Sequence, residues 1–303
     1  GGVVAMVPAT GEILALVSSP SFDPSIFLTP MTPAVWKEIM QNPQHPLEDR
    51  ALRGQYAPGS IFKVVVSVAG LMEGVIRPHD RVFCGGSFHL GRRTFRCWKK
   101  EGHGSVDFIK GLGESCDVYF YTMGRALGID RMAKYALELG LGRPTGIELN
   151  DAAGIMPTQA WKRKRFPHDR KWHPGETVNT SIGQGYIMLT PIQVAKAMSA
   201  VMNRGKVMVP HVLTSTKPRV EREIPMSDET LADIKAALKY VVQGDSGTAR
   251  VLQDPMFSIG GKTGTAQVAR LMTSKLGDEA DIPYHLRDHA WFFGVTPVES
   301  PEL

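Results

Sequence analysis

The chain has 303 residues, of which 43% are hydrophobic and 21% charged, with three cysteines and a formal net charge of +5. A chain this apolar is not intrinsically disordered, and at this size roughly three-quarters of its unfolded surface is hidden without disulfides. Three cysteines cannot form a disulfide framework, and the charge is too small to argue for nucleic acid. The first residues read as a strand with no lead-in, so we expect a fragment whose natural ends lie elsewhere.

The predicted elements place strands at both ends of the chain and helices between them. Turn residues separate two β-rich runs, which predicts a hairpin over 3–18, and prolines predict a loop over 19–32. Apolar runs and periodicity predict helices over 33–40, 60–72, 106–112, 117–127, 131–139, 191–203 and 228–243. Strands are expected at 146–149, 260–265 and 289–295, and irregular stretches at 41–59, 76–104 and 151–180. We therefore expect an α+β fold, with strands distant in sequence paired in one sheet and the helices packed against it.

Ser60 and Lys63 stand three residues apart at the start of an apolar helix, so their side chains share a face. A serine hydroxyl is a weak nucleophile until a neighbouring base takes its proton. The amine of Lys63 can act as that base only when it is neutral, which burial or a neighbouring cation favours. The alternative interpretation is a capping serine and a solvated lysine, but the Val-Val-Val run after Lys63 argues against solvation.

Two further motifs follow along the chain. Ser115-Cys116-Asp117 precedes an aromatic-rich helix, where Ser and Asp also serve as helix caps. In Lys262-Thr263-Gly264-Thr265, the two threonines point to one face of a strand, and Gly264 leaves the other face free for a close approach. Two hydroxyls and a lysine suit a substrate carboxylate. A glycine bulge beside an exposed lysine is the structural alternative.

Together, the three motifs match in order the set found in penicillin-binding proteins and β-lactamases. The chain resembles the transpeptidase domain of class B penicillin-binding proteins, most closely the elongation branch called penicillin-binding protein 2. Asp117 departs from the Asn that many relatives carry, although the elongation branch often has Asp here. The resemblance covers nearly the whole chain and includes residues 3–24, 56–60, 145–149, 181–186 and 289–292.

The resemblance implies a penicillin-binding fold, with an antiparallel sheet packed against a mainly helical subdomain. We expect a single transpeptidase domain over residues 1–303, in which a helical subdomain of roughly 33–200 is inserted between strands of the sheet. Relatives continue beyond Leu303 into another strand and a closing helix, so this C-terminal strand and helix are expected to be missing here.

The resemblance also implies a serine acyltransferase that needs no cofactor for catalysis. Ser60 would attack the penultimate D-alanine carbonyl of a peptidoglycan stem peptide, and Lys63 would act as its base. Ser115 would relay a proton to the leaving amine, and Lys262 would hold Ser115 and Lys63 in the right protonation states. Asp117 belongs to the same catalytic set, but its role differs from that of Asn because a carboxylate cannot donate as an amide does.

By the same resemblance, the strand motif would bind the substrate. Thr263 and Thr265, with Gly264 between them, would hold the terminal carboxylate of the donor peptide. The backbone N–H groups of Ser60 and Thr265 would form the oxyanion hole. An amine of a neighbouring stem peptide would then take the acyl group, and β-lactams would acylate Ser60 because they mimic the D-Ala-D-Ala end.

All three cysteines fall in one segment with a histidine among them, in the order Cys84, Cys97, His103 and Cys116 and the spacing C-x12-C-x5-H-x12-C. Cys84 and Cys97 lie in a polar loop that could not build its own core. A tetrahedral Cys3His zinc site would fix such a loop as a structural centre. The rivals are a disulfide and buried cysteines that behave as small hydrophobes.

Two other functions remain open at this point. A β-lactamase shares the fold and the motifs, but the chain has no E-x-x-L-N element, and the interval between Asp117 and Lys262 is long. A non-catalytic β-lactam sensor would keep the fold, although intact motifs argue against it. The basic run over 161–172 is interpreted as a solvated loop near an anionic surface rather than a nucleic-acid site.

The resemblance further implies partners and a location. The partners are peptidoglycan stem peptides, β-lactam antibiotics and a membrane-bound glycan polymerase, with no nucleic acid among them. The full-length protein is expected to be membrane-anchored, with this domain on the periplasmic or extracytoplasmic face of the cell envelope.

Overall fold

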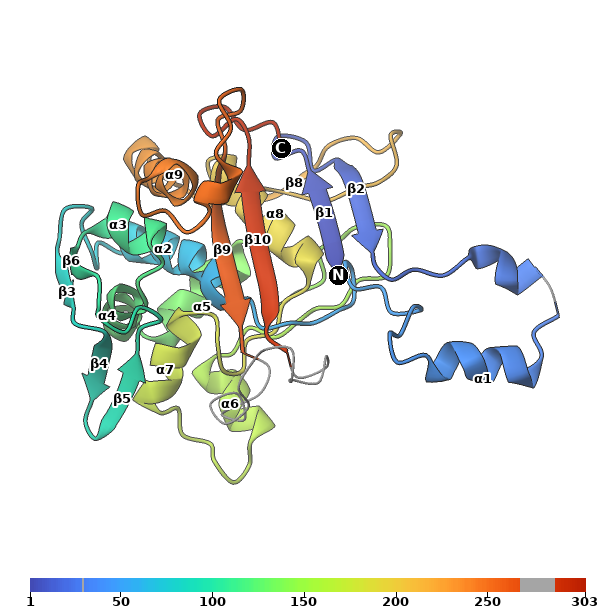
Figure 1. The fold of residues 1–303 in the computed structure, drawn as a ribbon, viewed down its shortest axis with the longest axis horizontal. Helices are drawn as coiled ribbons and strands as arrows, with labels where there is room; N and C mark the ends of the chain where they lie inside the picture. The colour runs from blue at the N-terminus through green and yellow to red at the C-terminus, as the bar shows by residue number, and fades with distance from the viewer. Residues whose placement is uncertain (29, 268–286) are drawn as a thin grey trace.

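The computed structural model describes residues 1–28, 30–267 and 287–303. Two antiparallel strand pairs lie in the middle of the view in Figure 1. The first pair joins β1 (Gly2–Met6) to β2 (Ile13–Ser18), and the second joins β9 (Gly260–Ala266) to β10 (His289–Val295). Helix α8 (Pro191–Met202) packs against β1, and α9 (Asp228–Gln243) packs against β9.

The core is built around helix α2 (Phe62–Met72), whose residues 62–70 are all buried. Apart from Lys63 and Ser67 its residues carry no polar side chain, which is typical of a helix surrounded by others. Helices α4 (Asp117–Leu127), α5 (Ile129–Glu138) and α9 pack directly on it. The remaining helices are α1 (Pro33–Gln41), α3 (Phe108–Gly113), α6 (Gln159–Arg165) and α7 (Pro174–Ser181).

Short strand pairs and 3-10 turns complete the structure. The strands are β3 (Val82–Cys84), β4 (Ser87–Leu90), β5 (Arg93–Arg96), β6 (Gly104–Val106), β7 (Lys206–Met208) and β8 (Val220–Glu223). They form the antiparallel pairs β3–β6, β4–β5 and β7–β8. The turns are η1 (Pro24–Leu28), η2 (Gly59–Ile61) and η3 (Arg250–Leu252). None of the described helices combines the length and the apolar composition needed to cross a bilayer.

The predicted α+β class is confirmed, but several local predictions are wrong. Residues 146–149 form no strand, because Ile147 is buried in a small cluster with Leu52 and Ile192 without joining a ladder. The stretch 151–180, predicted to be irregular, contains α6 and most of α7. The stretch 76–104 holds short strands whose hydrophobic pattern is too brief to detect.

Two further details differ from the sequence-based expectation. The helix expected from 106 begins at Phe108, because the Asp107 side chain accepts the N–H of Lys110 and caps it. Within the described residues, hydrogen bonds join the strands in pairs rather than in one continuous sheet. The β1–β2 pair, in contrast, is the hairpin predicted over 3–18. Its short turn costs little loop entropy.

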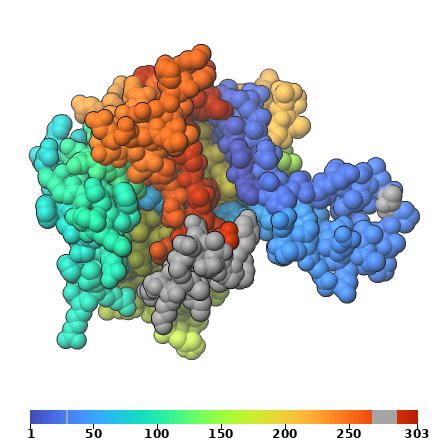
Figure 2. Space-filling view, viewed as in Figure 1, coloured from blue at the N-terminus to red at the C-terminus, as the bar shows by residue number. Residues whose placement is uncertain are grey.

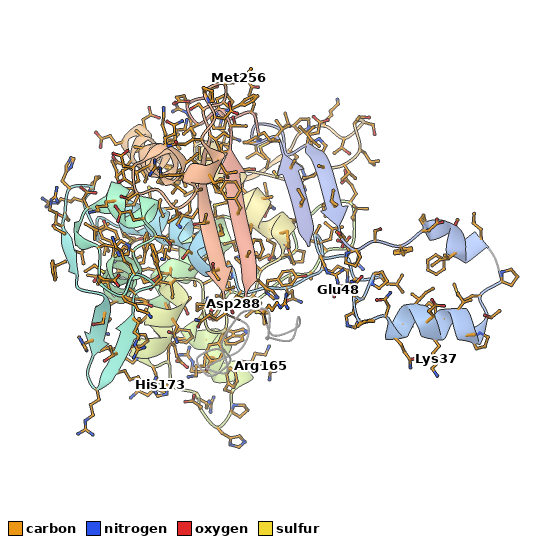
Figure 3. All side chains as sticks on the ribbon, viewed as in Figure 1. Lys37, Glu48, Arg165, His173, Met256 and Asp288 are labelled. Atoms are coloured by element: carbon orange, nitrogen blue, oxygen red, sulfur yellow. The ribbon has the colours of Figure 1, made fainter. Side chains whose placement is uncertain are left out.

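An arm formed by about residues 20–48 extends away from the body of the molecule (Figure 2). It carries η1 and α1, and no residue of α1 is buried. Lys37 projects from this helix in Figure 3. The arm therefore adds nothing to the core, which lies in the rest of the chain.

Candidate active site

A cavity of about 1390 Å³ opens between β9, α7 and β5. Arg93 and Arg96 of β5 line it. Asp288, which precedes β10 and is labelled in Figure 3, lines it as well. Residues from all three sequence motifs meet in its wall, although they lie far apart in the chain. These residues are Ser60, Ser115, Asp117, Thr263, Gly264 and Thr265.

Ser60 lies in turn η2, two residues before α2 begins at Phe62. The predicted helix start at Ser60 is therefore two residues too early. The turn is held close to β9 by Gly59, whose φ is +53°. A Cβ at Gly59 would lie 2.5 Å from the carbonyl oxygen of Thr265, so only glycine fits. The Gly59 N–H also donates to the Gly183 carbonyl at 3.0 Å. Main-chain contacts thus set the position of the serine.

Lys63 is completely buried and holds the second motif together. Its Nζ lies 2.6 Å from Oδ1 of Asp117, 3.1 Å from Oγ of Ser115 and 2.9 Å from the Ser115 carbonyl oxygen. An ammonium group has three protons and no lone pair, and these three contacts use every proton. As an ammonium group, Lys63 would therefore have no lone pair for the proton of another group, and the Asp117 carboxylate lies nearest to accept one of its own protons.

Trp98 clamps the second motif from the cavity side. Its backbone N–H donates to Oδ2 of Asp117 at 2.9 Å, and its indole Nε1 donates to the carbonyls of Glu114 and Ser115, both at 3.1 Å. Ser115 needs this support because its φ is +56°, which is uncommon for a residue with a side chain. Sequence reasoning missed Trp98; its place directly after Cys97 was the available signal.

The geometry explains why position 117 carries Asp. Both groups that face this side chain, the Lys63 ammonium and the Trp98 N–H, are donors. A carboxylate offers two accepting oxygens, whereas an asparagine would turn its NH2 group toward one of these donors.

Lys262 is fully buried on β9, and its Nζ donates to the Thr263 carbonyl at 3.0 Å. Burial lowers the pKa of Lys262 well below its usual value, and the charge of Lys63 lowers it further, while Asp117 acts in the opposite direction. The site therefore favours the neutral amine of Lys262. Of its two expected partners, Ser115 and Lys63, Lys63 thus lies close enough to act on its charge.

We expect Lys262→Met to raise the melting temperature by about 2–4 °C at pH 6, because methionine removes the cost of burying a group that is charged in the unfolded chain. The pKa of Lys262 is lower in the folded than in the unfolded chain. Between these two values the unfolded chain binds more protons, so wild-type stability rises with pH across that window. The advantage of methionine should therefore shrink at pH 9. Calorimetry at both pH values checks this, and a variant less stable than wild type at pH 6 would contradict it.

Hydroxyl groups gather where β9 faces the cavity. Thr263 Oγ1 lies 2.7 Å from Oγ1 of Thr248, a residue that follows α9 and that sequence reasoning did not single out. The Thr265 carbonyl accepts a hydrogen bond from the Gln184 side chain at 3.3 Å. The absent side chain of Gly264 leaves room for the Pro58 carbonyl, which a Cβ would approach to 3.1 Å.

Cys84, Cys97, His103 and Cys116 form a buried cluster behind the second motif, with their ligand atoms within 4.8 Å of one another. Nδ1 of His103 lies 3.5 Å from Sγ of both Cys84 and Cys97. Ligands about 2.3 and about 2.0 Å from a tetrahedral zinc ion lie about 3.5 Å apart, so the set fits such an ion. The hydrogen bond between Cys97 and Cys116 lowers the pKa of Cys97 and raises the pKa of Cys116. Of this pair, Cys97 is therefore the one that more readily forms the thiolate that binds metals.

The basic run over 161–172 is not wholly solvated. Lys162 is buried and pairs with Glu176 of α7 and with Asp169. The Tyr186 hydroxyl also donates to Glu176, and Glu176 and Tyr186 line the cavity. Lys162 therefore supports a wall of the cavity. This role cannot be recognised in the sequence, because the residues around Lys162 are also basic.

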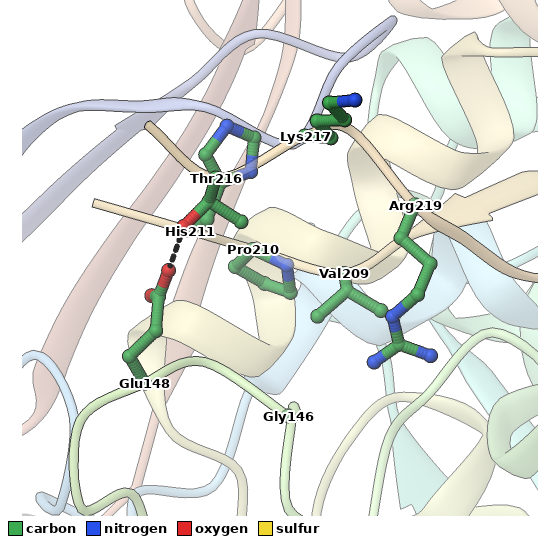
Figure 4. Close-up of a pocket in the computed structure, with 8 residues that line it drawn as sticks. All are labelled: Gly146, Glu148, Val209, Pro210, His211, Thr216, Lys217 and Arg219. Atoms are coloured by element: carbon green, nitrogen blue, oxygen red, sulfur yellow. Dashed lines mark hydrogen bonds between the residues drawn. The ribbon is translucent and has the colours of Figure 1, made fainter. Parts of the chain in front are cut away.

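A second cavity, of about 300 Å³, shares no lining residue with the first (Figure 4). Its only carboxylate is Glu148, which accepts hydrogen bonds from the Thr216 hydroxyl at 2.9 Å and from the Val212 N–H at 3.3 Å. None of the residues that line it belongs to the three motifs. Its lining is Gly146, Glu148, Val209, Pro210, His211, Thr216, Lys217 and Arg219.

Comparisons with known proteins all point to the same family. The family model described as penicillin binding protein transpeptidase domain matches residues 1–303. The peptidoglycan D,D-transpeptidase MrdA of Acinetobacter baumannii is 39% identical over 316 residues, which cover 100% of this chain and 46% of the relative. MrdA of Escherichia coli K12 is 35% identical, covering 99% and 49%. The chain spans about half the length of these curated relatives.

Solved structures show the same fold. Pseudomonas aeruginosa PBP2 in complex with WCK 5153 has a TM-score of 0.88 and 35% identity, covering 100% of this chain and 67% of that one. Helicobacter pylori PBP2 in complex with MreC has a TM-score of 0.89 and 31% identity, covering 100% and 54%. A ceftriaxone acyl-enzyme complex of Mycobacterium tuberculosis penicillin-binding protein A has a TM-score of 0.78 and 27% identity, covering 100% and 66%.

Proposed function

Because the chain belongs to the penicillin-binding protein transpeptidase family, we propose that it is a serine D,D-transpeptidase that cross-links peptidoglycan stem peptides. One observation carries the proposal: Ser60, the Lys63–Ser115–Asp117 network and the Lys262–Thr265 strand converge on one cavity. Relatives named as peptidoglycan D,D-transpeptidases support the same substrate class.

The first half-reaction forms an ester on Ser60. The serine oxygen attacks the carbonyl carbon of the penultimate D-alanine, and the bond to the last D-alanine breaks. Lys63, after releasing a proton to Asp117, takes the serine proton. Ser115 gives its own proton to the leaving amine and receives the one on Lys63, and Asp117 returns its proton to Lys63. The backbone N–H groups of Ser60 and Thr265 stabilise the oxyanion.

The substrate is held by its terminal carboxylate. Thr263 and Thr265 are the proposed hydroxyl donors, and Gly264 allows β9 to lie close to the serine turn. In the second half-reaction an amine of another stem peptide attacks the ester carbon, forming the cross-link and releasing Ser60. β-Lactams follow the first half-reaction alone and remain on Ser60, as the acyl-enzyme complex of a structural relative illustrates for that protein.

We also propose a structural zinc ion at Cys84, Cys97, His103 and Cys116. The support is the ligand chemistry and spacing, together with the position of Cys116 between Ser115 and Asp117. The ion would fill its coordination sphere with protein ligands, so it would fix the shape of this region rather than activate water.

For the full-length protein we propose a membrane-anchored location with this domain on the outer face of the cytoplasmic membrane, and a membrane-bound glycan polymerase as partner. A structural relative described as part of a peptidoglycan synthase complex that coordinates polymerization and crosslinking supports this.

The test is intact mass after incubation with benzylpenicillin. We expect a lasting adduct of one penicillin mass on wild type, mapped to the peptide that contains Ser60, and none on Ser60→Ala. Formation of a dimer from synthetic D-Ala-D-Ala stem peptides then distinguishes a transpeptidase from a sensor. Rapid hydrolysis of nitrocefin without a lasting adduct would instead indicate a β-lactamase.

A further inference from the structure

The turn after α9 is hydrogen-bonded to the end of α3 and to α9 itself. The Thr248 N–H donates to the Gly113 carbonyl at 3.4 Å, and the Ala249 N–H donates to the Val241 carbonyl at 2.8 Å. At Gly247 a Cβ would lie 2.3 Å from the Tyr240 carbonyl oxygen, so the turn lies tightly against the end of α9. These contacts bring the half-buried Thr248 into the cavity wall.

Thr248 contacts a hydroxyl that is proposed to bind the substrate. Its Oγ1 lies 2.7 Å from Oγ1 of Thr263, the usual distance for a hydrogen bond between two hydroxyls. One proton lies between the two oxygens, and each hydroxyl has one proton to give. The direction of this bond decides which hydroxyl keeps a proton for the cavity.

A substrate carboxylate accepts hydrogen bonds and donates none. If Thr263 donated to Thr248, its oxygen would present only lone pairs to the carboxylate and repel it. If Thr248 donates to Thr263, the Thr263 proton is free to point at the carboxylate, and the bond is charge-assisted. The chain of donors then runs from Thr248 through Thr263 to the ligand.

We propose that Thr248 is a positioning residue that directs the Thr263 proton toward the terminal carboxylate of the donor substrate or of a β-lactam. The inference rests on the proposed function, since it concerns the same site. Thr248 would not contact the reacting atoms and would act only through Thr263 on the carboxylate. The effect of a Thr248 substitution should therefore depend on whether the ligand carries that negative charge.

The experiment measures the second-order rate constant of acylation with benzylpenicillin and with its methyl ester. Thr248→Val should lower the constant for benzylpenicillin about 10-fold, while the constant for the ester falls no more than about twofold. Thr248→Ser, which keeps the hydroxyl, should stay within about twofold of wild type for both. The ester reaction also shows that each variant retains a folded active site.

Several outcomes would overturn the inference while leaving the proposed function intact: an unchanged benzylpenicillin rate in Thr248→Val, equal losses for acid and ester, or a serine variant as slow as the valine variant. A double-mutant cycle adds a second criterion. In a Thr263→Val background, Thr248→Val should have no further effect, whereas additive losses would show that the two hydroxyls act separately. Failure of the wild type to form an adduct would instead overturn the proposed function.

Discussion

Replacing Asp117 with alanine is expected to lower the free energy of unfolding by about 3–5 kcal/mol and to slow acylation of Ser60 at least about 100-fold. The fully buried Lys63 ammonium would lose its counter-ion, whose side chain is itself only 11% exposed. The Trp98 N–H would lose its acceptor as well. Chemical denaturation and the rate of labelling by a fluorescent penicillin measure the two effects.

Asp117→Asn is the matched variant, because it keeps the shape and removes the charge. It should unfold more readily than wild type but less readily than the alanine variant, since one of its two facing donors still finds an oxygen. Its acylation should be nearly as slow as that of Asp117→Ala, because an amide cannot take the proton that Lys63 must release. Wild-type acylation in Asp117→Asn would show that the proton takes another route.

Cys97→Ser is expected to abolish stoichiometric zinc binding and to lower the melting temperature by about 10 °C. A ligand present at about 1,000 times its dissociation constant stabilises a fold by about 4 kcal/mol, and about 1 kcal/mol corresponds to a few degrees in a domain of this size. His103→Ala should behave in the same way. Elemental analysis and calorimetry before and after EDTA measure these changes.

The control for this comparison is His168→Ala, which removes an exposed histidine outside the cluster. It should keep both the zinc and the melting temperature of wild type. Alkylation of the denatured wild type, without reductant but with EDTA, should label all three cysteines. Equal zinc in wild type and Cys97→Ser, or a single reactive thiol, would refute the zinc site, and the latter would indicate a disulfide.

The motifs could be predicted because each depends on close sequence spacing. Ser60 and Lys63 lie one helical turn apart, and the threonines of β9 alternate along a strand. That three motifs meet in one cavity came from the family resemblance, since no local pattern encodes contacts between residues 60, 115 and 263. The cysteine cluster was accessible because cysteines occur nowhere else in the chain.

The residues that support the site were not predictable in this way. Trp98 acts through its backbone N–H and one indole nitrogen, and Thr248 through a single hydroxyl, so neither leaves a pattern. Lys162 was hidden in a run of basic residues, although its buried pairing with Glu176 differs from that of its neighbours. Helix α7 was missed because it is short and polar and its start is set by Pro174 and Glu176.

Gly59, which precedes Ser60, affects which substitutions the cavity can accumulate during evolution. Because Gly59 meets Thr265 and Gly183 through main-chain atoms, these contacts of the serine turn do not depend on which side chains line the cavity. Substitutions in the walls can therefore alter which peptides or antibiotics fit while the ester-forming geometry is inherited unchanged. Substitutions that confer resistance to a β-lactam can therefore arise at many positions of the cavity wall, but not at Gly59, where no larger residue fits.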